Sequence, residues 1–341
     1  MNLTFATVAF RSGLLFLVLM GVFILSLTQG VFSIDWSAVW NGDTGTGDWE
    51  VFLSRLTRSS LAIAVGMILA VVGTLYQALT RNPLADPFLL GVSGGAAVGA
   101  TLAITLGAGA LSWGAWTFAL PSMSAFLGAL LALALVIRLA KVRGHLSVYR
   151  LLLVGVVINF LASSAVMVLK TFGGSVEVRS LLLWLVGTLS WATPTEAFFT
   201  TAIGGVGCLY CLRWVSALNV LSVGDPGAGL MGIDVPRVQK QIFLVSSLLV
   251  GLAVSVSGLV GFVGLVVPHA LRQLVGPDHR ILLPTAMLGG GIFLLVCDLL
   301  ARMLFPLLGS DAPVGVVTSL LGGPVFLWLL SRDGKGRIHE P

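Results

Sequence analysis

Residues 54–100 read SRLTRSSLAIAVGMILAVVGTLYQALTRNPLADPFLLGVSGGAAVGA, and this stretch decides the fold of the chain. Arg55 and Arg58 precede a long apolar run, which ends in a polar elbow at residues 77–87 and gives way to a second, glycine-rich apolar run. About 20 apolar residues are enough for a helix to cross the hydrocarbon core of a bilayer. A chain that crosses the membrane, breaks at an Asn-Pro turn and re-enters it on small residues is typical of helices packed in a mobile bundle, rather than of a single membrane anchor.

The bulk composition agrees with a membrane protein. Hydrophobic residues make up 57% of the chain, charged residues 10%, and the mean hydropathy is +1.03, more apolar surface than a soluble globule can bury. We therefore predict an all-α polytopic membrane protein that forms a single transmembrane domain over residues 1–341. Ten transmembrane helices are expected near 12–32, 57–80, 89–107, 119–139, 148–169, 195–215, 240–256, 258–274, 281–305 and 313–331.

Two segments do not fit a simple span. Residues 241–274 would be about 51 Å long as one helix, too long for a single crossing, so we expect a break at residues 255–258. Residues 181–190 are too few to cross and are expected to form a short re-entrant helix. The spacing G-x6-G-x9-P occurs at Gly66 and again at Gly251. It indicates either an inverted repeat or chance in a chain with 42 glycines.

The distribution of basic residues predicts the topology. With ten spans both termini lie on one side, and 14 of the 19 Lys and Arg residues fall on that side. The positive-inside rule then places the N- and C-termini in the cytoplasm. Because these basic residues are scattered over loops, the net charge of +5 does not indicate a nucleic-acid partner.

The chain lacks the means to hydrolyse ATP or hold a metal. No G-x-x-x-x-G-K-[ST] motif is present, and Cys208 and Cys211 have no histidine or second cysteine pair nearby. We expect no catalytic residue, no metal site and no cofactor on this chain. Asp298 is an intramembrane acid four residues before Arg302, which fits either proton coupling or a structural ion pair.

Two helix faces are candidates for the transport pathway. Stripes of small and polar residues either bond neighbouring helices or face water, and both interpretations stay open here. Neither stripe has the charge needed to select a small ion, which favours a wide passage for a bulky cargo. The candidate lining residues are Gly155, Asn159, Ser163 and Met167 on the fifth span, and Gly315 and Ser319 on the tenth.

Each face of the membrane has one further candidate surface. On the outer side, Arg55, Arg58 and Arg302 either snorkel to lipid headgroups or dock an acidic patch of an external partner. On the inner side, residues 216–239 are too polar to span and bend at an Asp-Pro-Gly sequence. Two short amphipathic helices there would present apolar side chains to a cytoplasmic partner. The candidate residues of this coupling loop are Leu218, Leu221, Asp225, Pro226, Gly227, Leu230, Met231 and Gly232.

Five sequence blocks resemble those of one family of permeases. They are QALTRNPLADP at 77–87 with LGVSG at 90–94, GFVGLVVPH at 261–269, DHR at 278–280, PVGVVT at 313–318, and LGGPVF at 321–326. Together they resemble the permease subunits of type II ABC importers for iron–siderophore complexes, haem or vitamin B12. The resemblance covers about residues 50–331.

The resemblance implies partners and roles. It implies a bacterial inner-membrane complex of two permease subunits (here a homodimer), two ATPase subunits that bind ATP and Mg²⁺, and a periplasmic substrate-binding protein. By position, the three arginines pair with acids of the binding protein, residues 216–239 seat in the ATPase, and Ser147, Val148 and Tyr149 form a cytoplasmic gate. An ion-gradient-driven secondary transporter is the alternative, and co-purification of an ATPase would separate the two.

Overall fold

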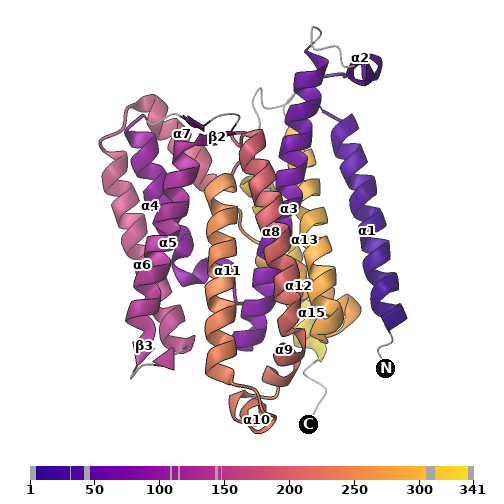
Figure 1. Ribbon diagram of the computed structural model, residues 1–341, viewed down its shortest axis with the longest axis vertical. Coiled ribbons are helices and arrows are strands. Elements are labelled where there is room, and N and C mark those ends of the chain that lie inside the picture. The colour runs from indigo at the N-terminus through magenta and orange to yellow at the C-terminus, as the bar shows by residue number, and fades with distance from the viewer. Residues whose placement is uncertain are drawn as a thin grey trace.

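The computed structural model describes residues 5–30, 32–41, 47–107, 110–113, 116–142, 145–146, 148–304 and 312–336. In this part the chain is a helical bundle with two short β-hairpins (Figure 1). The hairpins are antiparallel, β1 (Ala110–Trp113) with β2 (Trp116–Ala119) and β3 (Lys141–Val142) with β4 (His145–Leu146). The helices are α1 (Phe5–Thr28), α2 (Trp36–Trp40), α3 (Asp48–Thr80), η1 (Pro87–Leu90), α4 (Val92–Thr105), α5 (Leu120–Ala140), α6 (Val148–Lys170), α7 (Ser175–Val186), α8 (Pro194–Cys211), η2 (Leu212–Trp214), α9 (Val215–Leu221), α10 (Asp225–Leu230), α11 (Val235–Ser257), α12 (Val263–Val275), α13 (His279–Met303) and α15 (Val314–Gly336).

The predicted polytopic all-α fold is confirmed. Among the described residues, seven helices are long and apolar enough to cross a bilayer, namely α1, α3, α5, α6, α8 with its continuation to residue 221, α11 and α13. Three shorter apolar helices, α4, α12 and α15, fall on the remaining predicted spans, so a count of ten crossings stays a prediction. The bounds differ most in the first 60 residues, where α1 lies at Phe5–Thr28 and α3 begins at Asp48. Asp48 and Glu50 extend α3 beyond its apolar run because acids stabilise the N-terminal turn of a helix.

Helix α3 lies at the centre of the bundle, where it packs against α8, α11, α12 and α13. A Cβ atom on Gly66 would lie 2.2 Å from the carbonyl oxygen of Gly290 on α13, so the two backbones touch where no side chain would fit. Without a hydrophobic force between helices in lipid, such close approach of small residues holds them together. Helix α3 ends at Thr80 because Pro83 follows, and Arg81 caps it in the left-handed conformation at φ 51°.

Breaks between helices meet one another inside the bundle. The predicted break after α11 is confirmed: the helix ends at Ser257, and Gly258 has φ 66°. The carbonyl of Ser257 accepts a hydrogen bond from Thr188 N at 2.9 Å, and the carbonyl of Gly187 accepts one from Gly315 N at 3.2 Å. Irregular backbone at membrane depth must find such partners in the protein, since lipid offers none. These contacts bring the breaks before α8, α12 and α15 together.

Two expectations about internal structure have different outcomes. The short helix expected near residues 181–190 is present as α7, whose 12 residues span about 18 Å, roughly half of the hydrocarbon core. The G-x6-G-x9-P spacing falls on unlike positions: Gly73 lies inside α3, whereas its counterpart Gly258 terminates α11. This spacing therefore gives no support for an inverted repeat.

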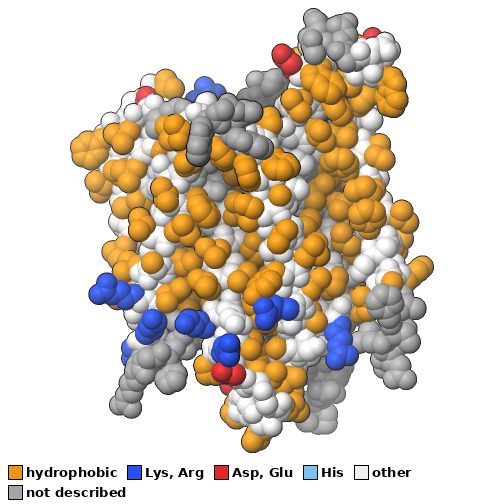
Figure 2. All heavy atoms as spheres, in the orientation of Figure 1, with side chains coloured by type: hydrophobic (Ala, Val, Ile, Leu, Met, Phe, Trp, Pro, Cys, Tyr) orange, Lys and Arg blue, Asp and Glu red, His pale blue; other side chains and the backbone are white. Residues whose placement is uncertain are grey.

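The two ends of the bundle differ in charge. Helices α9 and α10 lie at one end, called here the α10 end, whereas α2 and the β1–β2 hairpin lie at the other, the α2 end (Figure 1). Figure 2 shows Lys and Arg side chains gathered towards the α10 end and apolar side chains over the flank between the ends. Leu17 of α1, Phe160 of α6 and Leu327 of α15 are each at least 68% exposed, as expected of side chains that face lipid or another membrane helix.

Candidate transport pathway and docking surfaces

The stripe on α6 lines a cavity of about 390 Å³. Asn159, Ser163 and Met167 contribute to one wall, while α4 and α7 provide the others through residues such as Ser93 and Leu182. Ser163 directs its hydroxyl back to the carbonyl of Asn159 at 2.9 Å, a bond that an apolar-facing serine makes within its own helix. Three of the four predicted α6 residues therefore line a common space.

The stripe on α15 lines a second cavity, of about 470 Å³. Gly315 and Ser319 face this space, which Phe88 of η1 closes on another side. Leu185 and Leu259 line both cavities, so the two are neighbours across these side chains. We call the two cavities together the pathway groove. The structure thus brings the predicted α6 and α15 residues, which are about 150 positions apart in the chain, to one groove.

Two residues of the predicted lining have a packing role. Gly155 does not line the groove: a Cβ there would lie 2.4 Å from the carbonyl oxygen of Leu89, so glycine is required for α6 to approach η1. This corrects its assignment to the pathway. Asn159 both lines the cavity and bonds neighbouring segments. Its Nδ2 donates to Phe88 O at 2.8 Å and its Oδ1 accepts from Gly94 N at 3.1 Å. It ties the break around η1 to α6.

The predicted gate lies at the beginning of α6. Ser147 is outside the described residues, and Val148 is the first residue of the helix. Tyr149 follows and is 76% exposed at the α10 end of α6. Tyr149 does not line either cavity of the pathway groove, and its role as a gate stays a prediction.

The predicted coupling loop has the expected form of two short helices. Helix α9 ends at Leu221, and α10 begins at Asp225 with Pro226 in its first turn, where proline is tolerated. Gly227 lies inside α10, and Gly232 follows it with φ 85°.

The apolar residues of this loop face two directions. Leu230 is 92% exposed and Met231 is 65% exposed, whereas Leu218 and Leu221 are buried in the core. The expectation that all four are presented to a partner is thus wrong for the two residues on α9, which anchor the loop instead. Val223, 67% exposed between the helices, is a surface residue that the sequence pattern did not single out.

Polar contacts tie the coupling loop to the membrane helices. Asp225 forms an ion pair with Arg81 at the end of α3 at 3.1 Å and accepts a hydrogen bond from Gln239 of α11 at 3.2 Å. Asn219 of α9 donates to Asp278, the N-cap of α13, at 2.7 Å. Burial raises the pKa of Asp278, but hydrogen bonds from Arg280 N and Asn219 outweigh it, and the pKa is lowered from its ordinary value. The carboxylate therefore stays ionised and keeps α9 on α13.

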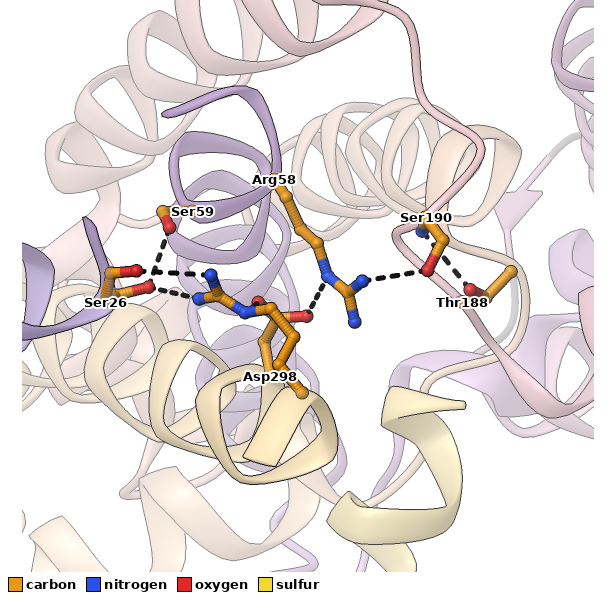
Figure 3. Close-up of polar contacts among 7 residues, drawn as sticks. Ser26, Arg58, Ser59, Thr188, Ser190 and Asp298 are labelled. Atoms are coloured by element: carbon orange, nitrogen blue, oxygen red, sulfur yellow. Dashed lines mark hydrogen bonds and ion pairs between the residues drawn. The ribbon is translucent and has the colours of Figure 1, made fainter. Parts of the chain in front are cut away.

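A buried ion network lies near the α2 end (Figure 3). Asp298 on α13, fully buried, accepts a hydrogen bond from Arg58 Nε on α3 at 2.7 Å. Arg302 Nε lies 3.1 Å from the other carboxylate oxygen, an ion pair without hydrogen-bond geometry. Arg58 also donates to Ser190 at 3.0 Å, and Arg302 donates to the carbonyl and the hydroxyl of Ser26 on α1. The structural ion pair expected for Asp298 is confirmed, with a second arginine added.

Arg55 has a separate structural task. It donates to the carbonyls of Leu27 and Thr28 at 3.0 and 3.2 Å, and also to that of Phe32. The carbonyls of Leu27 and Thr28 are orphan acceptors at the C-terminal end of α1, which a guanidinium satisfies well, and that of Phe32 belongs to the segment that follows.

The burial of these arginines corrects the sequence-based prediction of an exposed docking patch. Arg55, Arg58 and Arg302 are 6–8% exposed and are engaged with groups of the same chain. The three side chains lie towards the α2 end, but they are not presented at its surface. Arg58 alone lines a cavity of about 340 Å³ at this end, which Glu50, Ser54 and Ser190 also line.

The fold and the groove define a class of protein, a polytopic membrane permease whose passage is lined mostly by uncharged polar and apolar side chains. Among the described residues no group of three metal-ligating side chains occurs. The chain belongs to the FecCD transport family, whose model matches residues 16–332.

Relatives agree with this assignment. The chain is 39% identical over 301 residues to the hemin transport system permease protein HmuU of Yersinia pestis, which covers 86% of this chain and 87% of that protein. It is 37% identical over 255 residues to the vitamin B12 import system permease protein BtuC of Klebsiella pneumoniae, covering 75% and 74%. A solved ABC transporter of metal-chelate type, in an inward-facing conformation, matches with a TM-score of 0.81 and 29% identity over 95% of this chain and 99% of that one. The protein is a permease subunit of an ABC importer, and the alternative of an ion-gradient-driven transporter is not supported.

Proposed function

We propose that this permease imports an iron–siderophore complex, haem or vitamin B12 across a bacterial inner membrane by alternating access. The pathway groove is the observation that supports a bulky cargo: its two cavities have volumes of about 390 and 470 Å³, and most of their lining is apolar or weakly polar. Such walls hold a large molecule without binding it tightly, as rapid release requires. The cargo classes are those in the names of the relatives, hemin and vitamin B12, and the metal-chelate type of the solved neighbour.

The α10 end is proposed to meet one of the two separate ATPase subunits of the complex, which bind the ATP and Mg²⁺ that this chain does not. Leu230 and Met231 provide an exposed apolar knob at the tip of α10, suited to a hydrophobic groove of a partner. The ion pair of Asp225 with Arg81 joins α10 to α3, so that a displacement of α10 is passed to the central helix. In this assignment both termini and the α10 end are cytoplasmic, as the positive-inside rule requires.

Acidic substitutions on the knob test the ATPase assignment. Leu230→Asp with Met231→Asp should prevent co-purification of the ATPase and abolish ATP-driven uptake, because a carboxylate would be buried at the contact. Leu274→Asp is the matched control, since Leu274 is 75% exposed at the end of α12 and outside the coupling loop. Normal co-purification with the double variant would remove the assignment of α10.

The α2 end is proposed to dock the periplasmic binding protein at the cavity lined by Ser54 and Arg58. The buried network there has two guanidinium groups for one carboxylate. Glu50, which lines the same cavity, offsets part of this positive charge, and Arg58 is the group that attracts an acid of the partner. Ser54→Glu, at an exposed residue of the cavity, should weaken stimulation of ATP turnover by the binding protein and leave the network intact. The neutral variant Ser54→Gln should keep the stimulation. Equal stimulation in both variants would show that docking lies elsewhere.

A second copy of the chain is proposed to complete the passage. The groove opens beside an apolar face of α6 and α15, where Phe160, Leu161 and Leu320 are 62–72% exposed. A homodimer that covers this face would place a groove on each side of its axis. Cysteine cross-linking between copies through Phe160→Cys, with Leu17→Cys on the opposite lipid-facing helix α1 as the control, tests the arrangement. Cross-linking through Leu17→Cys alone would contradict it.

A further inference from the structure

One charged side chain lines the pathway groove. Lys170, in the last turn of α6, borders the cavity of about 390 Å³ together with Met167 and Ser163, three and seven positions before it on the same helix face. Every other lining residue of the two cavities is uncharged. Lys170 thus continues the stripe of Asn159, Ser163 and Met167 to the α2 end of α6, where cargo would enter.

No acid forms an ion pair with Lys170 in the described part of the protein, where Arg58, Arg81 and Arg302 each pair with an aspartate. A cation in the last turn of a helix interacts favourably with the helix dipole. That role alone would not require Lys170 to border a cavity. A lysine beside a cavity with apolar walls has a stronger field than one in open water, because the low-dielectric surroundings screen it less.

We propose that Lys170 selects a cargo that combines an apolar body with an anionic group, such as a carboxylate-bearing macrocycle or an anionic iron chelate. Leu182, Leu185 and Leu259 of the same cavity contact the apolar body, and the ammonium of Lys170 attracts the anionic group. A neutral cargo gains nothing from this lysine. The inference rests on the proposed import function and narrows its cargo class.

The test is ATP-dependent uptake into proteoliposomes by the whole complex of permease, ATPase and binding protein. The probes are hemin and a ferric tricatecholate, both anionic, and a ferric trihydroxamate and cyanocobalamin, both without net charge. Vesicles without ATP give the passive entry of each probe. The variants are Lys170→Gln and the charge-conserving Lys170→Arg. Lys141→Gln is the control, because Lys141 is an exposed lysine outside both cavities.

The expected result is uptake of an anionic probe, with an initial rate at subsaturating cargo that falls about tenfold in Lys170→Gln, a factor equivalent to 1.4 kcal/mol. Lys170→Arg and Lys141→Gln should keep the rate, and ATP hydrolysis without cargo should be unchanged in all variants. Uptake confined to neutral probes, or an unchanged rate in Lys170→Gln, overturns the role of Lys170 and leaves the import function standing. No ATP-dependent uptake of any probe by the wild type overturns the import function, and this inference with it.

Discussion

At the residue scale, the buried network of Arg58, Asp298 and Arg302 explains how charged side chains can lie at membrane depth in this protein. Isolated charges in hydrocarbon are expensive, and they persist where they pair with one another and with protein dipoles. Asp298 contacts both guanidinium groups, and the hydroxyls of Ser26 and Ser190 accept further hydrogen bonds from these groups. Helices α1, α3 and α13 and the segment before α8 are thereby held at one point.

Removal of the shared carboxylate should destabilise the fold strongly. Asp298→Asn leaves two buried guanidinium groups without a counter-charge, and we expect the free energy of unfolding to fall by about 3–5 kcal/mol. The control is Asp225→Asn, whose ion pair with Arg81 is about half exposed and should contribute at most about 1 kcal/mol. Unfolding of both variants in detergent micelles measures the difference, and equal stabilities would contradict the structural role of Asp298.

The sequence could predict only part of this network. The spacing of Asp298 and Arg302 by one helical turn indicated their ion pair from local geometry. The contact of Arg58 with Asp298 spans 240 positions, and no local pattern specifies it. The same limit applies to Leu218 and Leu221: a leucine in a polar loop looks exposed in the sequence, whereas its burial depends on α9 folding back onto α3 and α13.

At the element scale, contact between helix backbones defines the core. The approach of α3 to α13 at Gly66 and Gly290 leaves no space for a methyl group. The sequence indicated helix positions well because apolar runs of membrane length are a strong signal. It could not indicate which glycines lie at contacts, since the chain has 42 of them and only the packed structure distinguishes Gly155 beside η1 from a glycine that faces a cavity.

Alanine at this contact should separate the helices. In Gly66→Ala the new Cβ would meet the carbonyl oxygen of Gly290, and we expect a loss of about 1–3 kcal/mol from overpacking. Gly21→Ala on α1 is the matched control, because nothing lies within 4 Å of that position and alanine favours helix more than glycine does. Thermal unfolding in detergent compares the two, and a Gly66→Ala protein as stable as Gly21→Ala would refute the contact.

At the scale of the whole molecule, the two ends have different partners in the proposed complex, and accessibility to reagents distinguishes them. Cys208, Cys211 and Cys297 are fully buried, so the native chain should react little with a membrane-impermeant maleimide. Trp40 and Leu230 are both 92% exposed, at opposite ends. Trp40→Cys should react on intact cells, whereas Leu230→Cys should react only after the membrane is permeabilised. Reaction of both from one side would exclude the proposed topology.

Helix α3 has a mechanical consequence for the whole permease. It runs from the Arg58 network to the ion pair of Arg81 with Asp225, and its tightest contact, Gly73 against Gly264 of α12, lies between them. At 1.5 Å per residue this fulcrum is about 22 Å from Arg58 and about 12 Å from Arg81. A rigid rod that tilts about such a point moves its two arms in opposite directions. A displacement imposed through Asp225 would therefore arrive near Arg58 reversed in sense and about twice as large.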